Sequence, residues 1–593
     1  MDPIGPGEAS PLYVDGSETR REAATRRRRR GSFLVAITVL AAAATTLRSP
    51  RDATATVTAL HRDRRTPMRD VRPLSAALAD NHSEDVVEFP PLTTKYVYLP
   101  AADGQLKVFP SWNGGLQAPT RRVRVNQTVR VTLINSLYDE EVSVHHHGVH
   151  QVGTPYYDGT QNIAQPGLAS GQTMTYEFKA WPAGTHWYHS HTGLTLGDGL
   201  RGLFIVEDPD DPWKHFYSVD EALMFYEWNW HTELEMWESK QQAPDTPQDF
   251  EAGVVNGVVS KNRSGTNEGY VVHVGAGRTA RLRLCYAGVN FKTSVTIDGH
   301  NMTVIAKDGA TTAPLTTRRV VVHAAERYDV LVPASLTPGD YTINIDVTIH
   351  GMAADAYRGK QRGGQHDNNE TLYGGHFNAT LRVRGVDLNS SHVSHRELAL
   401  PPSPFVEEVQ VATSVHELHS AEPTETDPVP RTADRQIPVV ITARFGWMQK
   451  DGDRINAAPA SAASTGAWMV NNNSWVDPTA PLYLTKGKCC TSTQKHFETQ
   501  IVDVEYDEVV DLVVIQNGLG STVEYHPLHL HGYRFWVVAS GPLPYNESAV
   551  EYNLIDPLHV DTFPVRTGYY YVLRLRANNP GMWHLHCHLV YHM

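Results

Sequence analysis

The chain has 593 residues, of which 41% are hydrophobic and 20% are charged; this is the composition of a soluble globular protein long enough for three or four domains. Its formal net charge of −13 argues against nucleic acid as a partner. Only 4 residues are cysteine, which excludes a disulfide-stabilised scaffold, whereas 30 are histidine.

Residues 1–55 combine a basic arm with an apolar segment. Residues 26–30 are all arginine, and residues 33–47 follow without a charge. This uncharged stretch is short for a membrane span and is typical of the core of a signal peptide. We therefore predict secretion; the alternative is an uncleaved signal anchor that tethers an extracellular protein to a membrane. Nine Asn-x-Ser/Thr sequons predict a glycosylated exterior: Asn81, Asn126, Asn262, Asn301, Asn369, Asn378, Asn389, Asn472 and Asn546.

The next segments predict a lead-in followed by a first block of strands. Residues 56–91 are polar and rich in arginine and aspartate, so we expect a disordered lead-in. Within residues 92–212, hydrophobic residues recur at alternating positions, as at Val129, Val131 and Leu133. Alternation with a period of two indicates half-buried strands, and turn residues separate them.

The rest of the chain repeats this pattern in two further blocks. Residues 213–385 form the second block and residues 436–593 the third. Between them, residues 386–435 contain many serines, prolines and glutamates and are interpreted as a linker. Long helical periodicity is missing from all three blocks. Short strands at regular spacing predict an all-β protein built of three β-sandwich or barrel domains.

Four short clusters hold many of the histidines, and each contains a His-x-His pair. In a strand, residues two apart point to the same side, so each pair can present two imidazoles to one point. Two clusters lie in the first block and two in the third. A single site made from all eight imidazoles must therefore lie between the first and third domains. The pairs are His145 and His147, His189 and His191, His529 and His531, and His586 and His588.

The last pair encloses a cysteine, Cys587. Its thiolate points to the opposite side from the two flanking imidazoles and can bind a second metal. Imidazole with thiolate is a ligand set suited to copper. Zinc hydrolysis fits poorly, because it has no need of a thiolate between two imidazoles.

With their flanking residues, the clusters resemble the motifs of the multicopper oxidases and, within them, the laccases. The resemblance covers roughly residues 92–593 and depends on four ordered motifs, each with fixed internal spacing. The motifs are His145-x-His147-Gly148 with Asp158-Gly159, Trp187-Tyr188-His189-Ser190-His191, His526-Pro527-x-His529-x-His531-Gly532, and His586-Cys587-His588-x-x-x-His592.

This resemblance implies three consecutive cupredoxin-like Greek-key β-sandwich domains and four copper ions. It further implies a monomeric oxidase of phenolic, diphenol-type substrates, in which single electrons enter at a type 1 copper and O2 is reduced to water at a cluster of three. Carried over by position, the ligands are His526, Cys587 and His592 for type 1, His145 and His529 for type 2, and His147, His189, His588, His191, His531 and His586 for the type 3 pair.

Two other functions remain as alternatives. A metal oxidase such as a ferroxidase belongs to the same family and would need acidic residues beside the type 1 histidines. A copper-free cupredoxin protein with an adhesive role would be expected to have lost ligands, and all eleven ligand positions are filled here.

Two carboxylates are candidate proton carriers. Asp158 matches the acid that the family keeps near the type 2 copper, and we predict that it supplies protons; the alternative is a structural Asp-Gly turn. Many laccases have an acid five residues before an Asn-Gly pair in the second domain, which here is Glu251. Glu251 would accept the proton of a phenol as its electron leaves. The alternatives are an ordinary surface glutamate at this position, and Asp249 in the same role.

Several remaining positions carry weaker predictions. His146 points away from its neighbours in a strand, so it is expected to be structural, and His186 and His584, just outside the motifs, are expected to be packed or hydrogen-bonded. Cys285 is able to pair with one of two adjacent cysteines, Cys489 or Cys490. The family's axial type 1 position falls ten residues after the cysteine, beyond residue 593, so the third domain is interpreted as truncated and its axial residue is not assigned.

Overall fold

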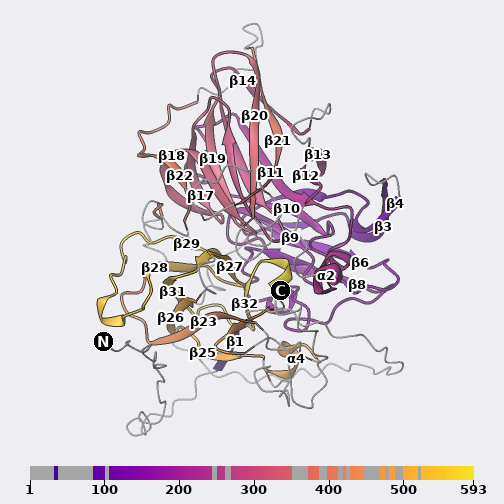
Figure 1. Ribbon diagram of the computed structural model, residues 1–593, viewed down its shortest axis with the longest axis vertical. Coiled ribbons are helices and arrows are strands. Elements are labelled where there is room, and N and C mark those ends of the chain that lie inside the picture. Colours follow the sequence, from indigo (N-terminus) through magenta and orange to yellow (C-terminus); the bar gives the residue numbers. More distant parts are fainter. Residues whose placement is uncertain are drawn as a thin grey trace, which may run out of the picture.

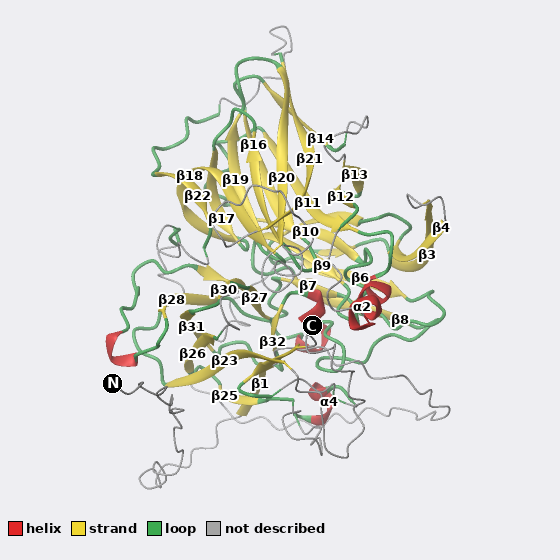
Figure 2. Cartoon of the chain, in the orientation of Figure 1, coloured by secondary structure: helices red, strands yellow, loops and turns green. Residues whose placement is uncertain are grey.

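The computed structural model describes residues 32–37, 85–100, 106–242, 250–260, 269–349, 372–385, 397–411, 418–421, 428–445, 466–473, 478, 480–487, 499–517 and 523–592. Strands dominate these residues, which confirms the all-β prediction. The described helices are short, α2 (Glu233–Gln242) and α4 (Leu482–Thr485), and both lie outside the sheets (Figure 2). Figure 1 shows three groups of strands that meet near the centre of the molecule.

Two sheets form the first domain. One sheet has the order β5-β10-β9-β7, and the other has the order β2-β6-β3-β4 with β8 beside β6. Alternating apolar residues of β6 face a core shared by both sheets, where Val129, Val131 and Trp112 are fully buried. The strands are β2 (Val86–Glu88), β3 (Leu92–Pro100), β4 (Leu106–Trp112), β5 (Ala118–Arg124), β6 (Thr128–Ile134), β7 (His145–His147), β8 (Thr173–Lys179), β9 (Gly184–His189) and β10 (Arg201–Glu207).

A 12-stranded sheet forms the second domain. Its strand β22 falls inside the predicted linker 386–435 and pairs in parallel with β18, so part of that segment belongs to this sheet. The strands are β11 (Val219–Trp228), β12 (Ala252–Val255), β13 (Val258–Ser260), β14 (Val271–Gly275), β15 (Thr279–Tyr286), β16 (Lys292–Ile297), β17 (Met302–Lys307), β18 (Ala310–His323), β19 (Arg327–Pro333), β20 (Gly339–Ile349), β21 (Leu372–Arg384) and β22 (Phe405–Val409).

The third domain has a six-stranded sheet, β24-β23-β26-β31-β28-β29, and a five-stranded sheet, β25-β1-β32-β27-β30. Its strands are β23 (Arg435–Phe445), β24 (Gly466–Val470), β25 (Val502–Glu505), β26 (Val509–Gln516), β27 (Tyr525–Leu530), β28 (Phe535–Pro542), β29 (His559–Val560), β30 (Thr562–Arg566), β31 (Tyr569–Arg576) and β32 (His584–Cys587). Three short 3-10 turns complete the described elements: η1 (Pro155–Tyr157), η3 (Glu547–Ala549) and η4 (Val590–His592).

One strand of the five-stranded sheet comes from the N-terminal apolar segment. Strand β1 (Ser32–Ile37) lies between β25 and β32, antiparallel to the first and parallel to the second. The remainder of the predicted signal or anchor segment, residues 38–47, lies outside the described residues. Among the described residues, no helix is both long and apolar enough to cross a membrane.

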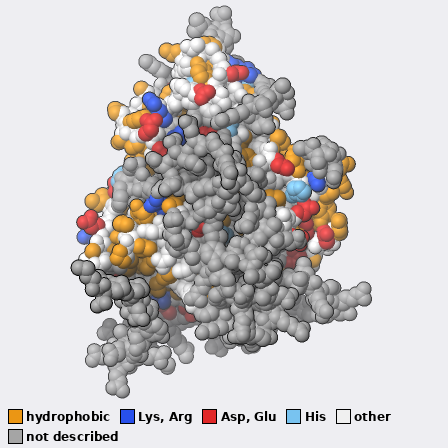
Figure 3. All heavy atoms as spheres, viewed as in Figure 1, with side chains coloured by type: hydrophobic (Ala, Val, Ile, Leu, Met, Phe, Trp, Pro, Cys, Tyr) orange, Lys and Arg blue, Asp and Glu red, His pale blue; other side chains and the backbone are white. Residues whose placement is uncertain are grey.

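Charged side chains on the surface are mixed in sign. On the face drawn in Figure 3, the acidic and basic side chains of the described residues lie interspersed.

Candidate metal centre

Strand pairing brings the four histidine clusters together in two pairs. In the first domain, β7 and β9 are antiparallel, with His145 opposite His189. In the third domain, β27 and β32 are antiparallel, with His529 opposite His586. Figure 2 labels all four of these strands near the centre of the molecule.

Side chains from the two domains meet in one buried group. The His147 and His529 rings stack with their centroids 3.6 Å apart, and those of His145 and His531 stack at 3.9 Å. The other two pairs from the first and third domains are close as well, at 5.1 Å for His189 with His588 and 5.1 Å for His191 with His586. The structure thus brings together all eight imidazoles of the four His-x-His pairs.

Many of the ring nitrogens in this group are buried and have no hydrogen-bond partner among the described residues. The opposite ring nitrogens of His145 and His529 do have partners, the main-chain oxygens of Asp158 at 2.8 Å and Asp561 at 2.9 Å. A buried nitrogen without a partner is costly unless it binds an ion, so the donor set fits a metal cluster. The nitrogens are Nε2 of His145, His189, His191 and His529, Nδ1 of His147, and both ring nitrogens of His588.

Burial favours the neutral form of three of these imidazoles. Burial, and after it the neighbouring imidazoles, hold the pKa values of His147, His189 and His191 well below the usual range. A neutral imidazole is the form that donates a lone pair to a metal. The group is therefore ready to bind cations in neutral solution.

A second group lies beside the first and contains the thiol. Cys587 Sγ is 3.5 Å from His526 Nδ1 and 3.7 Å from His592 Nδ1, and the two nitrogens are 3.3 Å apart. Burial raises the pKa of the Cys587 thiol to about 12, so its deprotonation needs the positive charge of a bound ion. A trigonal set of one thiolate and two imidazoles is typical of copper sites that transfer single electrons.

The predicted proton carrier Asp158 lies between ligands of both domains. Its Oδ2 is 2.8 Å from His531 Nδ1, and its Oδ1 is 3.3 Å from His145 Nδ1. The hydroxyl of Thr160 also donates to Oδ2, at 2.5 Å. Asp158 is fully buried, so its carboxylate can act directly on two of the predicted ligands.

The turn at Asp158 also depends on Gly159, whose φ is +86°. A Cβ at Gly159 would lie 1.8 Å from the main-chain oxygen of Val144, next to His145. We expect Gly159→Ala to lower the melting temperature strongly and to reduce copper binding, because the turn must move away from the cluster. Gly171→Ala is the control, since Gly171 has a φ of +76° but nothing within 4 Å of the added Cβ. That change should cost only the left-handed penalty of about 1–2 kcal/mol; equal melting temperatures for the two variants would contradict the clash.

The predicted substrate acid Glu251 is exposed directly before β12, where its carboxylate accepts a 2.9 Å hydrogen bond from the amide of Trp230. Its role as a proton acceptor stays a prediction. Glu524 is a carboxylate beside a predicted type 1 ligand: its Oε2 lies 3.8 Å from Nε2 of His526. The two residues are two positions apart, with Glu524 directly before β27 and His526 inside it, and in extended chain such residues point to the same side.

Two further residues lie against the predicted ligands: His584, which was expected to be packed or hydrogen-bonded, and Asp561, which the sequence analysis did not name. His584 stacks on His586 at 4.3 Å and lies in one group with His191 and His531. Because His584 and His586 form a further His-x-His pair in β32, the period of two was a signal that could have identified it. Asp561 forms another group with His147 and His529, and the sequence around it gave no such signal.

Other residues near the motifs take structural positions. His146 points to the apolar core, 4.6 Å from the ring of Phe178, and Nε2 of His186 is 2.9 Å from the main-chain oxygen of Pro182. Cys285 is a buried free thiol, while Cys489 and Cys490 lie outside the described residues.

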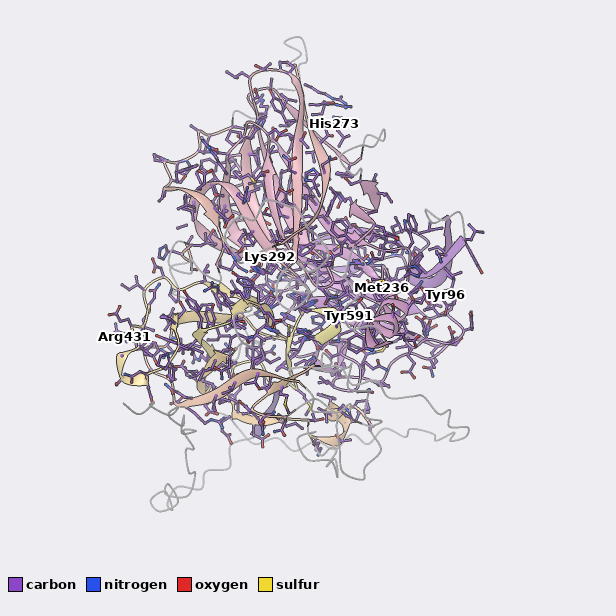
Figure 4. All side chains as sticks on the ribbon, in the orientation of Figure 1. Tyr96, Met236, His273, Lys292, Arg431 and Tyr591 are labelled. Atoms are coloured by element: carbon purple, nitrogen blue, oxygen red, sulfur yellow. The ribbon has the colours of Figure 1, made fainter. Side chains whose placement is uncertain are left out.

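The segment that carries His592 is fixed to α2 by a buried acid. The Tyr591 hydroxyl donates a 2.7 Å hydrogen bond to Glu233, the first residue of α2. Figure 4 labels Tyr591 and, in α2, Met236. Burial raises the pKa of Glu233 to about 7, and the charge of Glu227 adds to this, although Tyr591 and Arg201 oppose it.

This carboxyl makes stability depend on pH. Folding takes up a proton between the ordinary pKa of 4.5 and about 7, so the protein should lose stability as the pH rises through that window. The loss is worth up to about 3 kcal/mol, at ~1.4 kcal/mol per pH unit. The glutamine side chain of Glu233→Gln stays neutral at every pH. The melting temperature of this variant minus that of the wild type should therefore increase from pH 5 to pH 8. Parallel melting curves for the two proteins across this range would contradict the assignment.

Comparison with known families agrees with this geometry. Three family models, each described as multicopper oxidase, match residues 93–211, 220–369 and 467–593, which together make up well over half of the chain.

Similar proteins include several laccases. Laccase-1 of Botryotinia fuckeliana is 27% identical over 83% of this chain and 78% of its own length. Laccase-2 of Trametes versicolor is 27% identical over 79% and 80%, and Laccase-8 of Oryza sativa subsp. japonica is 28% identical over 81% and 86%.

Solved structures with a similar fold include the following two. The crystal structure of Fet3p, a multicopper oxidase that functions in iron import, has a TM-score of 0.64 at 22% identity, covering 86% of this chain and 88% of that one. The laccase from Botrytis aclada has a TM-score of 0.62 at 24% identity, covering 87% of each chain.

Proposed function

The chain belongs to the multicopper oxidases, and on that premise we propose that it couples one-electron oxidation of phenolic, diphenol-type substrates to the four-electron reduction of O2 to water. It is a laccase-like, copper-binding oxidoreductase. The observation that supports this function best is the position of Cys587, which joins the thiol group and the imidazole cluster within one strand.

We assign four copper ions to these two groups. The type 1 ion would be held by His526, Cys587 and His592. The other three would be held by the eight imidazoles from the first and third domains, divided as the family motifs imply. When bound, copper supplies one-electron transfer at the first group and the reduction of O2 at the second.

The residues of the chain supply the rest of the chemistry. His586 and His588 flank Cys587, so an electron has a short covalent path from the thiolate to the cluster. Full burial of these three side chains keeps water away from that path. Asp158, in contact with His145 and His531, is our candidate for delivering the protons that O2 reduction consumes.

Phenols are the preferred reductant class because the relatives that match most of the chain are laccases. The metal oxidase alternative gains one specific observation. The carboxylate of Glu524 lies 3.8 Å from the outer nitrogen of His526, where a negative charge would favour a cationic reductant. We further propose that the protein is extracellular, since the nine sequons favour the secretory route, and we propose that it is a monomer, as expected from the family resemblance.

Oxygen uptake by the copper-loaded full chain tests this function. With a diphenol we expect one O2 consumed per four substrate molecules oxidised by one electron each, without hydrogen peroxide. Absence of uptake with both the diphenol and ferrous iron would overturn the oxidase function. Uptake with iron alone would favour the metal oxidase, and Glu524→Gln should then raise KM for iron while leaving an uncharged phenol unaffected.

A further inference from the structure

The second domain carries no histidine cluster, yet one of its side chains reaches the metal group. Arg327, the first residue of β19, is fully buried. Its Nη1 donates to Oδ1 of Asp561 at 2.7 Å, and its Nη2 donates to Oδ2 at 2.6 Å. This forked pair fixes the plane of the carboxylate as well as its position.

Asp561 in turn contacts imidazoles from both ligand-bearing domains. Its Oδ1 is 3.3 Å from Nε2 of His147, in the first domain. Its main-chain oxygen is 2.9 Å from Nδ1 of His529, in the third domain. Thr562 assists, because its hydroxyl lies 3.1 Å from Nε2 of His147 and donates to Asp561 at 2.8 Å. Both imidazoles keep their other nitrogen for the cluster.

The same guanidinium also binds the strand that carries another imidazole. Nε of Arg327 donates to the main-chain oxygen of Thr185 at 3.1 Å, and Thr185 lies in β9, which ends at His189. Arg327 therefore joins β9 of the first domain to Asp561 of the third. Gly148 leaves room for this contact, since a Cβ there would lie 2.7 Å from Nη2 of Arg327.

Neighbouring charges keep this arrangement fixed. Asp308 lies 3.4 Å from Nη1 of Arg327, and its other oxygen is 2.8 Å from Nζ of Lys307. Lys307 also pairs with Glu326 at 2.8 Å, and all of these side chains are fully buried. A buried charge of this kind is strongly restrained, because it loses its partners if it moves.

We propose that Arg327 is a positioning residue for the copper cluster, acting through Asp561 to orient His147 and His529 and through Thr185 to hold β9 against the third domain. This inference rests on the proposed copper cluster. Outer partners of metal ligands typically change metal affinity by about 10- to 100-fold, so disturbing Arg327 should weaken copper binding at the cluster and leave the type 1 site intact.

Arg327→Lys tests the proposal, since lysine keeps the charge but loses the fork. The matched control is Arg574→Lys, because Arg574 forms a similar, almost fully buried forked pair with Asp511, at 2.7 and 2.8 Å, within the third domain. Copper per chain, the electron paramagnetic resonance spectrum of the type 2 copper, the visible absorption of the type 1 copper, and the rate of copper loss to a chelator are measured on full-length proteins.

For Arg327→Lys we expect a changed type 2 spectrum, copper loss about 10- to 100-fold faster, and an unchanged type 1 band. Arg574→Lys should lower the melting temperature without altering any copper signal. Equal copper loss in both variants, or an unchanged type 2 spectrum in Arg327→Lys, would overturn the proposal.

A second variant covers the case in which Arg327→Lys does not fold. Asp561→Asn keeps the shape of the side chain and should give the same copper phenotype; if Asp561→Asn folds with normal copper signals, the proposal is wrong. Failure of the proposed function has a different signature, because wild-type protein would then bind no copper and show no type 1 band.

Discussion

Replacing Cys587 with serine is expected to abolish oxygen uptake with every reductant, a loss of at least about 1,000-fold, as is typical when a group essential to the reaction is removed. The thiolate is the sulfur donor of the proposed type 1 site, and a serine hydroxyl does not ionise to replace it. The visible type 1 band should vanish, while the type 2 signal remains because the imidazole nitrogens of the cluster point to the other side of β32. Visible spectra and oxygen uptake of the copper-loaded variant measure both effects.

Cys285→Ser is the control for this change. Cys285 is also a fully buried free thiol, and it packs where the first and second domains meet, in one apolar group with Trp187 and Met224. Its loss should cost some stability and leave the type 1 band and the activity unchanged. Oxygen uptake that persists in Cys587→Ser would show that electrons reach the cluster without the thiolate and would refute the assigned electron path.

Local sequence patterns were sufficient to predict that eight imidazoles of the first and third domains meet in one group. A His-x-His pair needs only an extended strand to align two imidazoles, and strands are also what the alternating apolar residues predict. The distribution of the clusters over two separate blocks then required a site between domains. The same period of two also predicts that His584 lies on the same side of the strand as His586 and His588.

Contacts made by single residues across long separations were not predictable from one sequence. Arg327 and Asp561 are 234 positions apart, and neither stands in a recognisable motif. Only the packing of the second domain against the other two brings them together. The same holds for β22 and β1, whose composition indicated a linker and a signal segment but whose backbones pair with β18 and β32.

These contacts give the second domain a structural role at the metal site, although none of the predicted ligands comes from it. Its strand β19 begins with Arg327, which touches the first and third domains at once. A cluster divided between two domains is only as well ordered as the contact between them. Because the second domain contacts both of them through Arg327, it restricts the movement of the first domain relative to the third, and it does so next to the imidazoles.

Asp158→Asn is expected to lower the maximal rate of O2 reduction by about 100-fold, the lower end of what general acid–base groups contribute. Asparagine keeps the shape of the side chain, and its oxygen can still accept a hydrogen bond from His531. It cannot hold a proton and release it, however, so a fall in rate at normal copper content identifies proton delivery. Oxygen uptake at saturating diphenol measures the rate, and anaerobic bleaching of the type 1 band measures electron entry, which should not change.

The two interpretations of Asp158 give opposite results in this experiment. If Asp158 only forms a turn before Gly159, the asparagine variant keeps its rate, because asparagine is as common in such turns as aspartate. If the carboxylate only orients His531 and His145, copper content and the type 2 spectrum change together with the rate. A slow variant with full copper, a normal spectrum and normal type 1 bleaching leaves proton transfer as the step that needs the carboxylate.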